Sequence, residues 1–173
     1  MIDFRNADGT KFTDARAAAF KAIFDRLKTD KVLSRVVAKW SGMPSQIPQI
    51  TVNDLPYMQV TLGSGPIKVG SANSHDTVLT VEVAYAVSAA GADEDTAWID
   101  ILNLYSHIEM AIDPFGDIAW LRNAVTQVDS TAVVKGQPAF TAQGFSSVPL
   151  PEINAIAGKC MLSVTLKIDT CRS

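Results

Sequence analysis

The chain has 173 residues, a length that suits one domain, and we expect residues 1–173 to form a single domain. It is 47% hydrophobic and 19% charged, which excludes a disordered chain, and its 10 Gly, 8 Pro and 2 Cys exclude collagen-like and disulfide-dense proteins. Fifteen Lys and Arg against 18 Asp and Glu give a formal net charge of −3, which argues against a protein that grips nucleic acid through its phosphates.

The first ten residues, MIDFRNADGT, contain no basic segment followed by an apolar one and so do not predict a secretory signal. The sequence contains no run of 18 apolar residues, so no membrane span is predicted. The expectation is therefore a soluble protein that is intracellular when made. Its low charged fraction also suggests that other molecules cover part of its surface.

The first predicted helix runs from residue 13 to about residue 29. Thr13 is the expected N-cap, and Asp14 lies in the first turn, where the helix dipole favours a negative charge. The residues 32–40 (VLSRVVAKW) are rich in β-branched side chains and predict a strand. One apolar stripe of the helix is expected to be buried: Ala17, Phe20, Ile23, Phe24 and Leu27.

The middle of the chain predicts two strands separated by a long loop. Residues 57–62 alternate between apolar and polar side chains after Pro56, which cannot donate to a sheet ladder and so marks a strand start or a sheet edge. Residues 63–76 (GSGPIKVGSANSHD) are rich in Gly and Ser and predict a loop or a protruding arm. Residues 78–87 predict a strand with one face made of Leu79, Val81, Val83, Tyr85 and Val87.

A second helix is predicted from near Asp93 until Pro114 stops it. Acidic residues at its start suit the positive end of the helix dipole. We expect it to bury one continuous stripe: Trp98, Ile101, Leu102, Tyr105, Ile108, Ala111 and Ile112.

The last third of the chain has a weaker pattern. A short helix around Leu121, a strand over residues 125–134 and a long loop over residues 136–158 are expected from the apolar spacing and the Pro and Gly content. Residues 159–170 alternate strictly and predict a final, half-buried strand. The order of helix, strands, helix and strands predicts an α+β fold, with a mostly antiparallel β-sheet packed against two main α-helices and with long loops or arms.

The two cysteines lie in or beside the final strand. Cys160 and Cys171 are eleven residues apart, which in an extended segment is roughly 36 Å, whereas a disulfide needs Cα atoms within ~7 Å. We therefore expect two reduced cysteines.

No group of residues predicts catalysis. Ser74-His75-Asp76 contains the residue types of a hydrolase triad, but adjacent side chains cannot form the line of nucleophile, base and orienting acid. His107 has no strong second metal ligand beside it on its helix, so no metal site is expected. We expect no catalytic, cofactor-binding or metal-binding residues, no cofactor and no enzymatic activity. A small cytosolic enzyme or a ligand-binding domain is the alternative from a different class.

Five segments, in chain order, carry a likeness to a known family: AFKAIFDRLKT, LPYMQVTL, TVLTVEVAYAV, DEDTAWIDILNLYSHIEMAID and LSVTLKID. Their order and pattern resemble the tail terminator (tail completion) proteins of long-tailed bacteriophages. The likeness covers residues 13–115 and 159–169, about two thirds of the chain. Two further possibilities from the structural class stay open, the tail tube protein itself and a head–tail connector (neck) protein.

The resemblance implies a structural virion protein that forms a homohexameric ring. Such a ring caps the tail tube, ends its polymerisation and joins the tail to the head. The implied partners are further copies of the chain, the tail tube protein and a head-completion or connector protein, with no membrane partner. Genomic DNA would pass through the lumen without specific binding, and six copies at −3 each would carry −18, which repels phosphates. The implied location is the head–tail junction of the virion, after assembly in the host cytoplasm.

Overall fold

The fold was analysed in a computed structural model that describes residues 14–42, 50–63, 67–68, 74–90, 94–113, 116–140 and 146–169. The helices are α1 (Ala15–Thr29), α2 (Leu33–Val36), α3 (Glu94–Ile112) and α4 (Ala119–Thr126), with short 3₁₀ turns η1 (Val52–Asp54) and η2 (Pro151–Ile153). The strands are β1 (Lys39–Ser41), β2 (Tyr57–Leu62), β3 (Ile67–Lys68), β4 (Ser74–Ser88), β5 (Val133–Phe140), β6 (Ser146–Leu150) and β7 (Ala155–Asp169).

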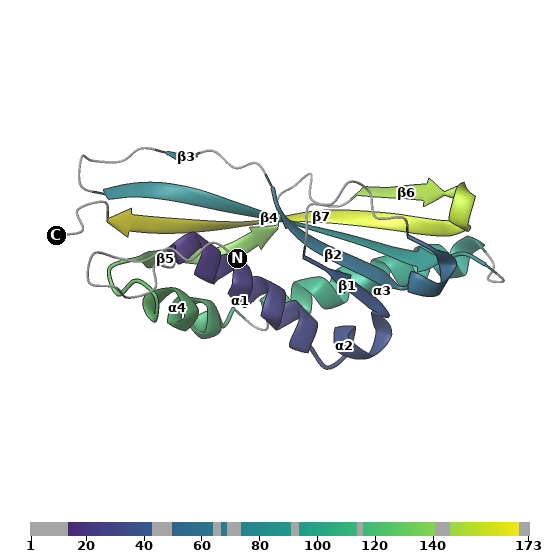
Figure 1. Ribbon diagram of the computed structural model, residues 1–173, viewed down its shortest axis with the longest axis horizontal. Coiled ribbons are helices and arrows are strands. Elements are labelled where there is room, and N and C mark those ends of the chain that lie inside the picture. The colour runs from purple at the N-terminus through teal and green to yellow at the C-terminus, as the bar shows by residue number, and fades with distance from the viewer. Residues whose placement is uncertain are drawn as a thin grey trace.

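The sheet is built on one long antiparallel pair, β4 with β7 (Figure 1). These strands match residue for residue from Ser74 opposite Asp169 to Ser88 opposite Ala155. The main order is β1-β2-β4-β7-β5, while β3 pairs with β4 and β6 pairs with β7 beside that path. Only the β1–β2 pair is parallel among the described strands. The predicted α+β class with a mostly antiparallel sheet is thus confirmed.

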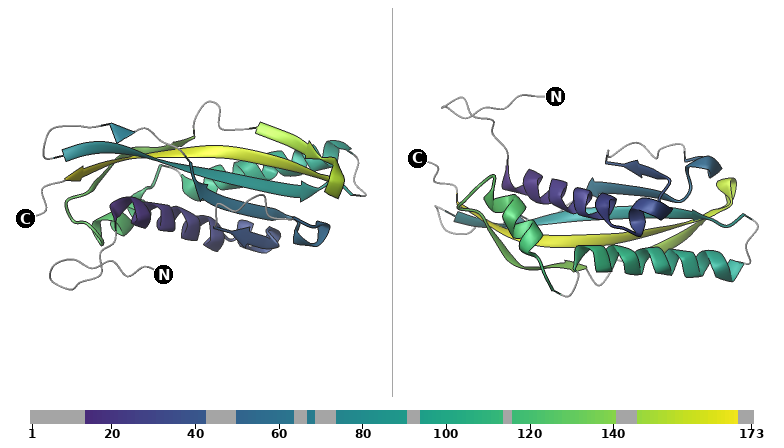
Figure 2. Two further views of the ribbon diagram at one scale, coloured as in Figure 1. Left: turned by 45° about the horizontal axis from the view of Figure 1, so that its top comes forward. Right: turned by 90° about the horizontal axis from the view of Figure 1, so that it is seen from below.

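The helices α1, α3 and α4 lie along the same face of the sheet (Figure 2, right). Alternation in the strands supplies the core beneath them, because every second side chain points to the helices. The side chains that point to the helices are the odd-numbered ones of β4 and the even-numbered ones of β7. Most of them are buried: Leu79, Val81, Val83, Tyr85, Val87, Leu162, Val164, Leu166 and Ile168. This confirms the predicted inward faces of both strands. No helix in the described part of the chain is long and apolar enough to cross a membrane.

Helix α1 begins two residues later than predicted. Its N-cap is Asp14, whose carboxylate accepts a hydrogen bond from the backbone N–H of Arg16 at 2.7 Å, while Thr13 lies outside the described residues. The Arg16 guanidinium also donates to this carboxylate and lowers the pKa of Asp14. The predicted stripe is partly wrong, since Ala17 is exposed. The fully buried positions of the helix are Ala15, Ala18, Ala19, Ile23 and Leu27.

Small alanines at the start of α1 are therefore its packing surface, and they let the helix lie close to the sheet.

At the other end of α1, Arg26 contacts two further helices, α3 and α4. Its Nε donates to the carbonyl of Ala111 at the end of α3, at 2.9 Å, and its guanidinium lies 5.5 Å from the centre of the Trp120 ring on α4. Both contacts are typical of Arg: a cation at a helix C-terminus and a cation over an aromatic face.

The strand predicted over residues 32–40 is wrong in its first half. Residues Leu33–Val36 form helix α2, and within the predicted range only Lys39 and Trp40 belong to a strand, β1. The cause is local, because the Asp30 carboxylate accepts hydrogen bonds from the N–H groups of Val32 and Leu33, both at 2.9 Å. This cap starts a helical turn, and it outweighs the weak β preference of the valines.

Two predicted loops are shorter than expected. Within residues 63–76 the structure places β3 and the first residues of β4. Within residues 136–158 it places the end of β5, all of β6 and the start of β7. The strand predicted over residues 125–134 is right only at Val133 and Val134, which begin β5, and its earlier residues are the end of α4 and a turn. Gly and Pro inside these strands, such as Gly136 and Pro138 of β5, give them the composition of a loop.

A glycine is required at position 158 of β7, because the aromatic ring of Tyr85 lies across it. Its cross-strand partner is Tyr85, and a Cβ built on Gly158 would lie 2.3 Å from Cε2 of that ring. Tyr85 is 1% exposed, so its ring has no room to move away. A residue without a side chain is therefore needed here to let the aromatic ring rest on the backbone of the neighbouring strand.

We predict that Gly158→Ala lowers the free energy of unfolding by about 1–3 kcal/mol, the usual cost of overpacking a core. Urea denaturation followed by circular dichroism measures this. Gly42→Ala is the matched control, because its new Cβ would approach only the edge of Phe24, at 3.4 Å. Equal stability of the wild type and Gly158→Ala would show that the Tyr85 ring does not occupy this position.

Candidate assembly surface

Helix α3 is apolar on two opposite sides. One side is buried against the sheet by Ala97, Ile101, Leu104, Ile108, Ala111 and Ile112. The other side carries Ile99, Leu102 and Met110, which are 55%, 51% and 55% exposed. Ile99 and Leu102 are three residues apart and adjoin on the helix surface, while Met110 lies on the same side about two turns further along. This outer face of α3 carries large apolar side chains beside polar ones such as Asp95 and Ser106, and it is a candidate contact surface.

The predicted stripe of this helix was right about its buried centre and wrong at two positions. Ile101, Ile108, Ala111 and Ile112 are buried as expected, whereas Leu102 is half exposed and Trp98 is 37% exposed. The predicted start at Asp93 lies outside the described residues. The error has a simple origin, since a helix with apolar residues on both sides offers no polar face by which to orient it.

A groove of about 430 Å³ lies between α2 and α3, above the end of β4. Its apolar lining includes Val32, which precedes α2, Val36 from α2 and Leu104 from α3. Asp100, Asn103 and His107 supply polar atoms from α3, so His107 lies in a surface groove and its half-buried position does not need a metal. No cluster of metal-ligating side chains occurs within the described ranges of the chain.

A basic face lies beside this groove, on α1 and α2. Between residues 15 and 36 the chain has six Lys or Arg and two Asp. One of these Asp residues pairs with Lys21 and the other caps α2. Lys28 rests on the Phe24 ring, 5.8 Å from its centre. For Lys31 and Arg35, which are exposed, the described residues supply no carboxylate partner.

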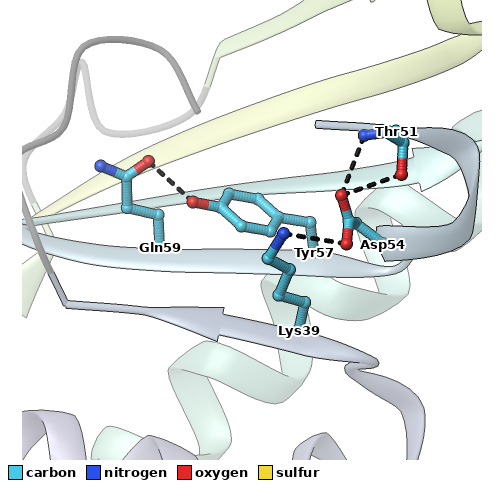
Figure 3. A network of polar contacts seen from close by, with 5 residues as sticks. All are labelled: Lys39, Thr51, Asp54, Tyr57 and Gln59. Atoms are coloured by element: carbon cyan, nitrogen blue, oxygen red, sulfur yellow. Dashed lines mark hydrogen bonds and ion pairs between the residues drawn. The ribbon is translucent and has the colours of Figure 1, made fainter. Parts of the chain in front are cut away.

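A polar network closes the sheet edge near β1 (Figure 3). The Asp54 carboxylate accepts hydrogen bonds from the backbone N–H and hydroxyl of Thr51, each at 3.0 Å, and pairs with Lys39 Nζ at 2.9 Å. These contacts, led by the Thr51 N–H, lower the pKa of Asp54 to about 2. Beside them the Tyr57 hydroxyl donates to Gln59 at 3.1 Å. The network is a structural turn, as Asn53-Asp54 in a loop would suggest, and it fixes the edge strand β1.

The Ser74-His75-Asp76 sequence lies at the start of β4, where successive side chains alternate between the two faces of the sheet. The expected loop is wrong at this point. Asp76 forms an ion pair with Lys135 of β5, 2.8 Å away, and so contributes to sheet pairing.

Cys160 is a free, buried cysteine on β7, and Cys171 lies outside the described residues. Burial raises the pKa of the Cys160 thiol to about 12, with the nearby carboxylate of Glu109 adding to this effect. The thiol is therefore protonated at neutral pH and behaves as a small apolar side chain. The Tyr85 hydroxyl lies in the same interior region and has no hydrogen-bond partner among the described residues.

Comparisons with known proteins give little information. No family model matches the chain, and no curated protein matches it. Among solved structures, one similar chain comes from a structure described as "Virion of native gene transfer agent (GTA) particle". The two chains are 14% identical, the match covers 86% of this chain and 94% of the other, and the TM-score is 0.44. A TM-score below 0.5 does not establish a shared fold, so function must be inferred from this chain's own residues.

We predict that adjacent substitutions on α3 have opposite outcomes. Ile101→Asp places an unpaired charge in the core and should lower the free energy of unfolding by about 3–5 kcal/mol, enough to unfold a domain of ordinary stability. Leu102→Asp should change it by no more than about 0.5 kcal/mol, because the side chain already lies in water. Thermal unfolding of the purified variants compares the two. A folded Ile101→Asp protein, or an unfolded Leu102→Asp protein, would mean that α3 is rotated relative to this description.

We also predict that the Asp54 carboxyl titrates with a midpoint near 2, against ~3.9 for an unperturbed Asp. Because the folded pKa is the lower one, this group stabilises the fold above pH ~4, and its contribution is lost as the pH falls from about 4 to about 2. Carbon-detected NMR titration of the carboxyl measures the midpoint. In Lys39→Met the midpoint should rise but stay below the ordinary value, because the Thr51 hydrogen bonds persist. A wild-type midpoint near 4 would contradict the network.

Proposed function

We propose that this chain is a structural protein of a phage-like tail, a tail terminator that assembles into a ring at the end of the tail tube. One observation carries the proposal: helix α3 has an apolar side that the rest of the described chain leaves open to solvent. Large apolar side chains that adjoin on one exposed helix surface, such as Ile99 and Leu102, are of the kind found at protein contact sites. The order of segments that resembles the tail terminator family supplies the particular role.

The role does not require catalysis, and we propose that the protein has no enzymatic activity. The described residues that chemistry would need have structural partners instead: Asp76 pairs with Lys135, Asp54 caps a turn, and Cys160 is buried and protonated. A formal charge of −3 for each copy suits a ring through which DNA slides without binding.

Termination then follows from symmetry. A ring forms when a head-to-tail contact closes on itself, and a tube forms when rings stack on one another. A terminator ring must present one surface that fits the last ring of the tube and another surface that does not fit a further ring. Its second surface is then free for a head-completion or connector protein.

Light scattering and negative-stain imaging of the purified chain, alone and with tail tubes from the same phage-like particle, test this function. We expect rings that bind one end of the tubes, and we expect Leu102→Asp to stay folded and lose the rings. Long filaments of the chain alone would show a tube protein instead. A monomer that never binds tubes at any concentration would overturn the proposal, and turnover of a substrate would overturn its non-enzymatic part.

A further inference from the structure

We propose that the outer face of α3 docks on the basic face of α1 and α2 of a second copy of this chain. This inference rests on the proposed ring and names the two surfaces that would meet at each junction. The outer face of α3 consists of Asp95, Ile99, Leu102 and Met110. The basic face consists of Lys28, Lys31, Val32, Arg35 and Val36.

The two faces carry opposite charges. Helix α3 has four acidic residues and no Lys or Arg over Glu94–Ile112. One of them, Asp95, belongs to the outer face, is exposed and has no ion-pair partner within the described ranges, whereas Asp100 lines the groove beside Val32 and Val36. The basic face is the reverse, since Lys31 and Arg35 are exposed cations that likewise have no carboxylate partner there. Each face therefore holds charges that the same chain leaves unpaired.

Both faces also carry exposed apolar side chains beside those charges. Ile99 and Leu102 on α3 are 55% and 51% exposed, and Val32, which precedes α2, and Val36 on α2 are 38% and 43% exposed. An apolar centre with charged residues around it is the usual composition of a protein–protein contact. The match in both apolar surface and charge favours another copy of this chain over a nucleic acid or a lipid, which would use the basic face alone.

Self-pairing of either face is disfavoured. Two α3 faces would bring Asp95 against a like charge, and two basic faces would do the same with Lys31 and Arg35, which is unfavourable across an interface. The favourable contact joins unlike faces. A contact between unlike faces is head-to-tail, so each copy offers α3 to one neighbour and the α1–α2 face to another. Such a chain of contacts closes into a ring when the rotation between copies is a whole fraction of a turn, as the proposed function requires, and otherwise continues as a filament.

A charge exchange between the faces tests this contact. Asp95→Lys and Lys31→Glu should each raise the concentration for half-assembly about tenfold or more, because like charges then face each other. The double variant Asp95→Lys with Lys31→Glu should return to within about threefold of the wild type, as the pair is restored in reversed order. Mass photometry over a dilution series reads the assembly, and thermal unfolding confirms that each variant is folded.

The control variant has the same net charge as the wild type, but its compensating substitution lies outside both faces. Asp95→Lys with Arg122→Glu also has a formal charge of −3, yet Arg122 is an exposed residue of α4 outside both faces. It should assemble as poorly as Asp95→Lys alone, and Arg122→Glu by itself should assemble like the wild type. Two results would overturn this contact and leave the ring function standing. One is equal recovery of assembly in the two double variants, and the other is unchanged ring formation in both Asp95→Lys and Lys31→Glu. A wild-type chain that stays monomeric would overturn both.

Discussion

The antiparallel pairing of β4 with β7 is the constraint on which the rest of this structure depends. Fifteen consecutive residues of each strand face one another without a bulge. A shift of one residue would turn every buried side chain of a strand to the opposite face, so the register is fixed by the whole apolar row at once. The other strands attach to this pair, β2 and β3 to β4, and β5 and β6 to β7. Helices α1, α3 and α4 cover the face that the pair makes apolar, and the position of α3 on that face decides which of its two apolar sides is left outside.

Under the proposed contact, assembly and stability would be separated on α3 by one step along the sequence. Ile101 is fully buried and Leu102 is half exposed, so neighbouring residues of similar size serve different purposes. The same separation holds for charge. Arg26 is used inside the molecule, as a hydrogen-bond donor to Ala111, while Lys31 and Arg35 are left outside with no carboxylate of their own. Exposed apolar side chains beside unpaired charges are uncommon on a monomer and typical of a surface that contacts another subunit.

The sequence predicted the parts of the fold where one face is buried and the other is not. Strict alternation identified the centres of β4 and β7, and helical spacing identified α1, α3 and α4. It failed where a local contact outweighs the pattern, as in the Asp30 cap that makes residues 33–36 helical. It failed again at β5, where Gly136 and Pro138 suggest a loop and where the pairing register shifts between Lys135 and Ala139. The candidate surface could not be predicted, because Leu102 and Ile101 look alike until the helix is placed on the sheet. The acidic composition of α3 and the basic composition of α1 were visible beforehand, but which of their residues lack partners was not.

Arg26 has a consequence for the shape of any assembly built from these faces. Apolar packing is non-directional and lets helices slide over a sheet, whereas the hydrogen bond from Arg26 to the Ala111 carbonyl has a fixed length and direction. It sets the lateral spacing between α1 and α3, and the Trp120 ring beneath the guanidinium holds α4 to the same point. In a ring joined through α1 and α3, that spacing is the distance between the two contact surfaces of each copy. In the proposed ring, the curvature would then depend in part on a contact that each copy makes within itself.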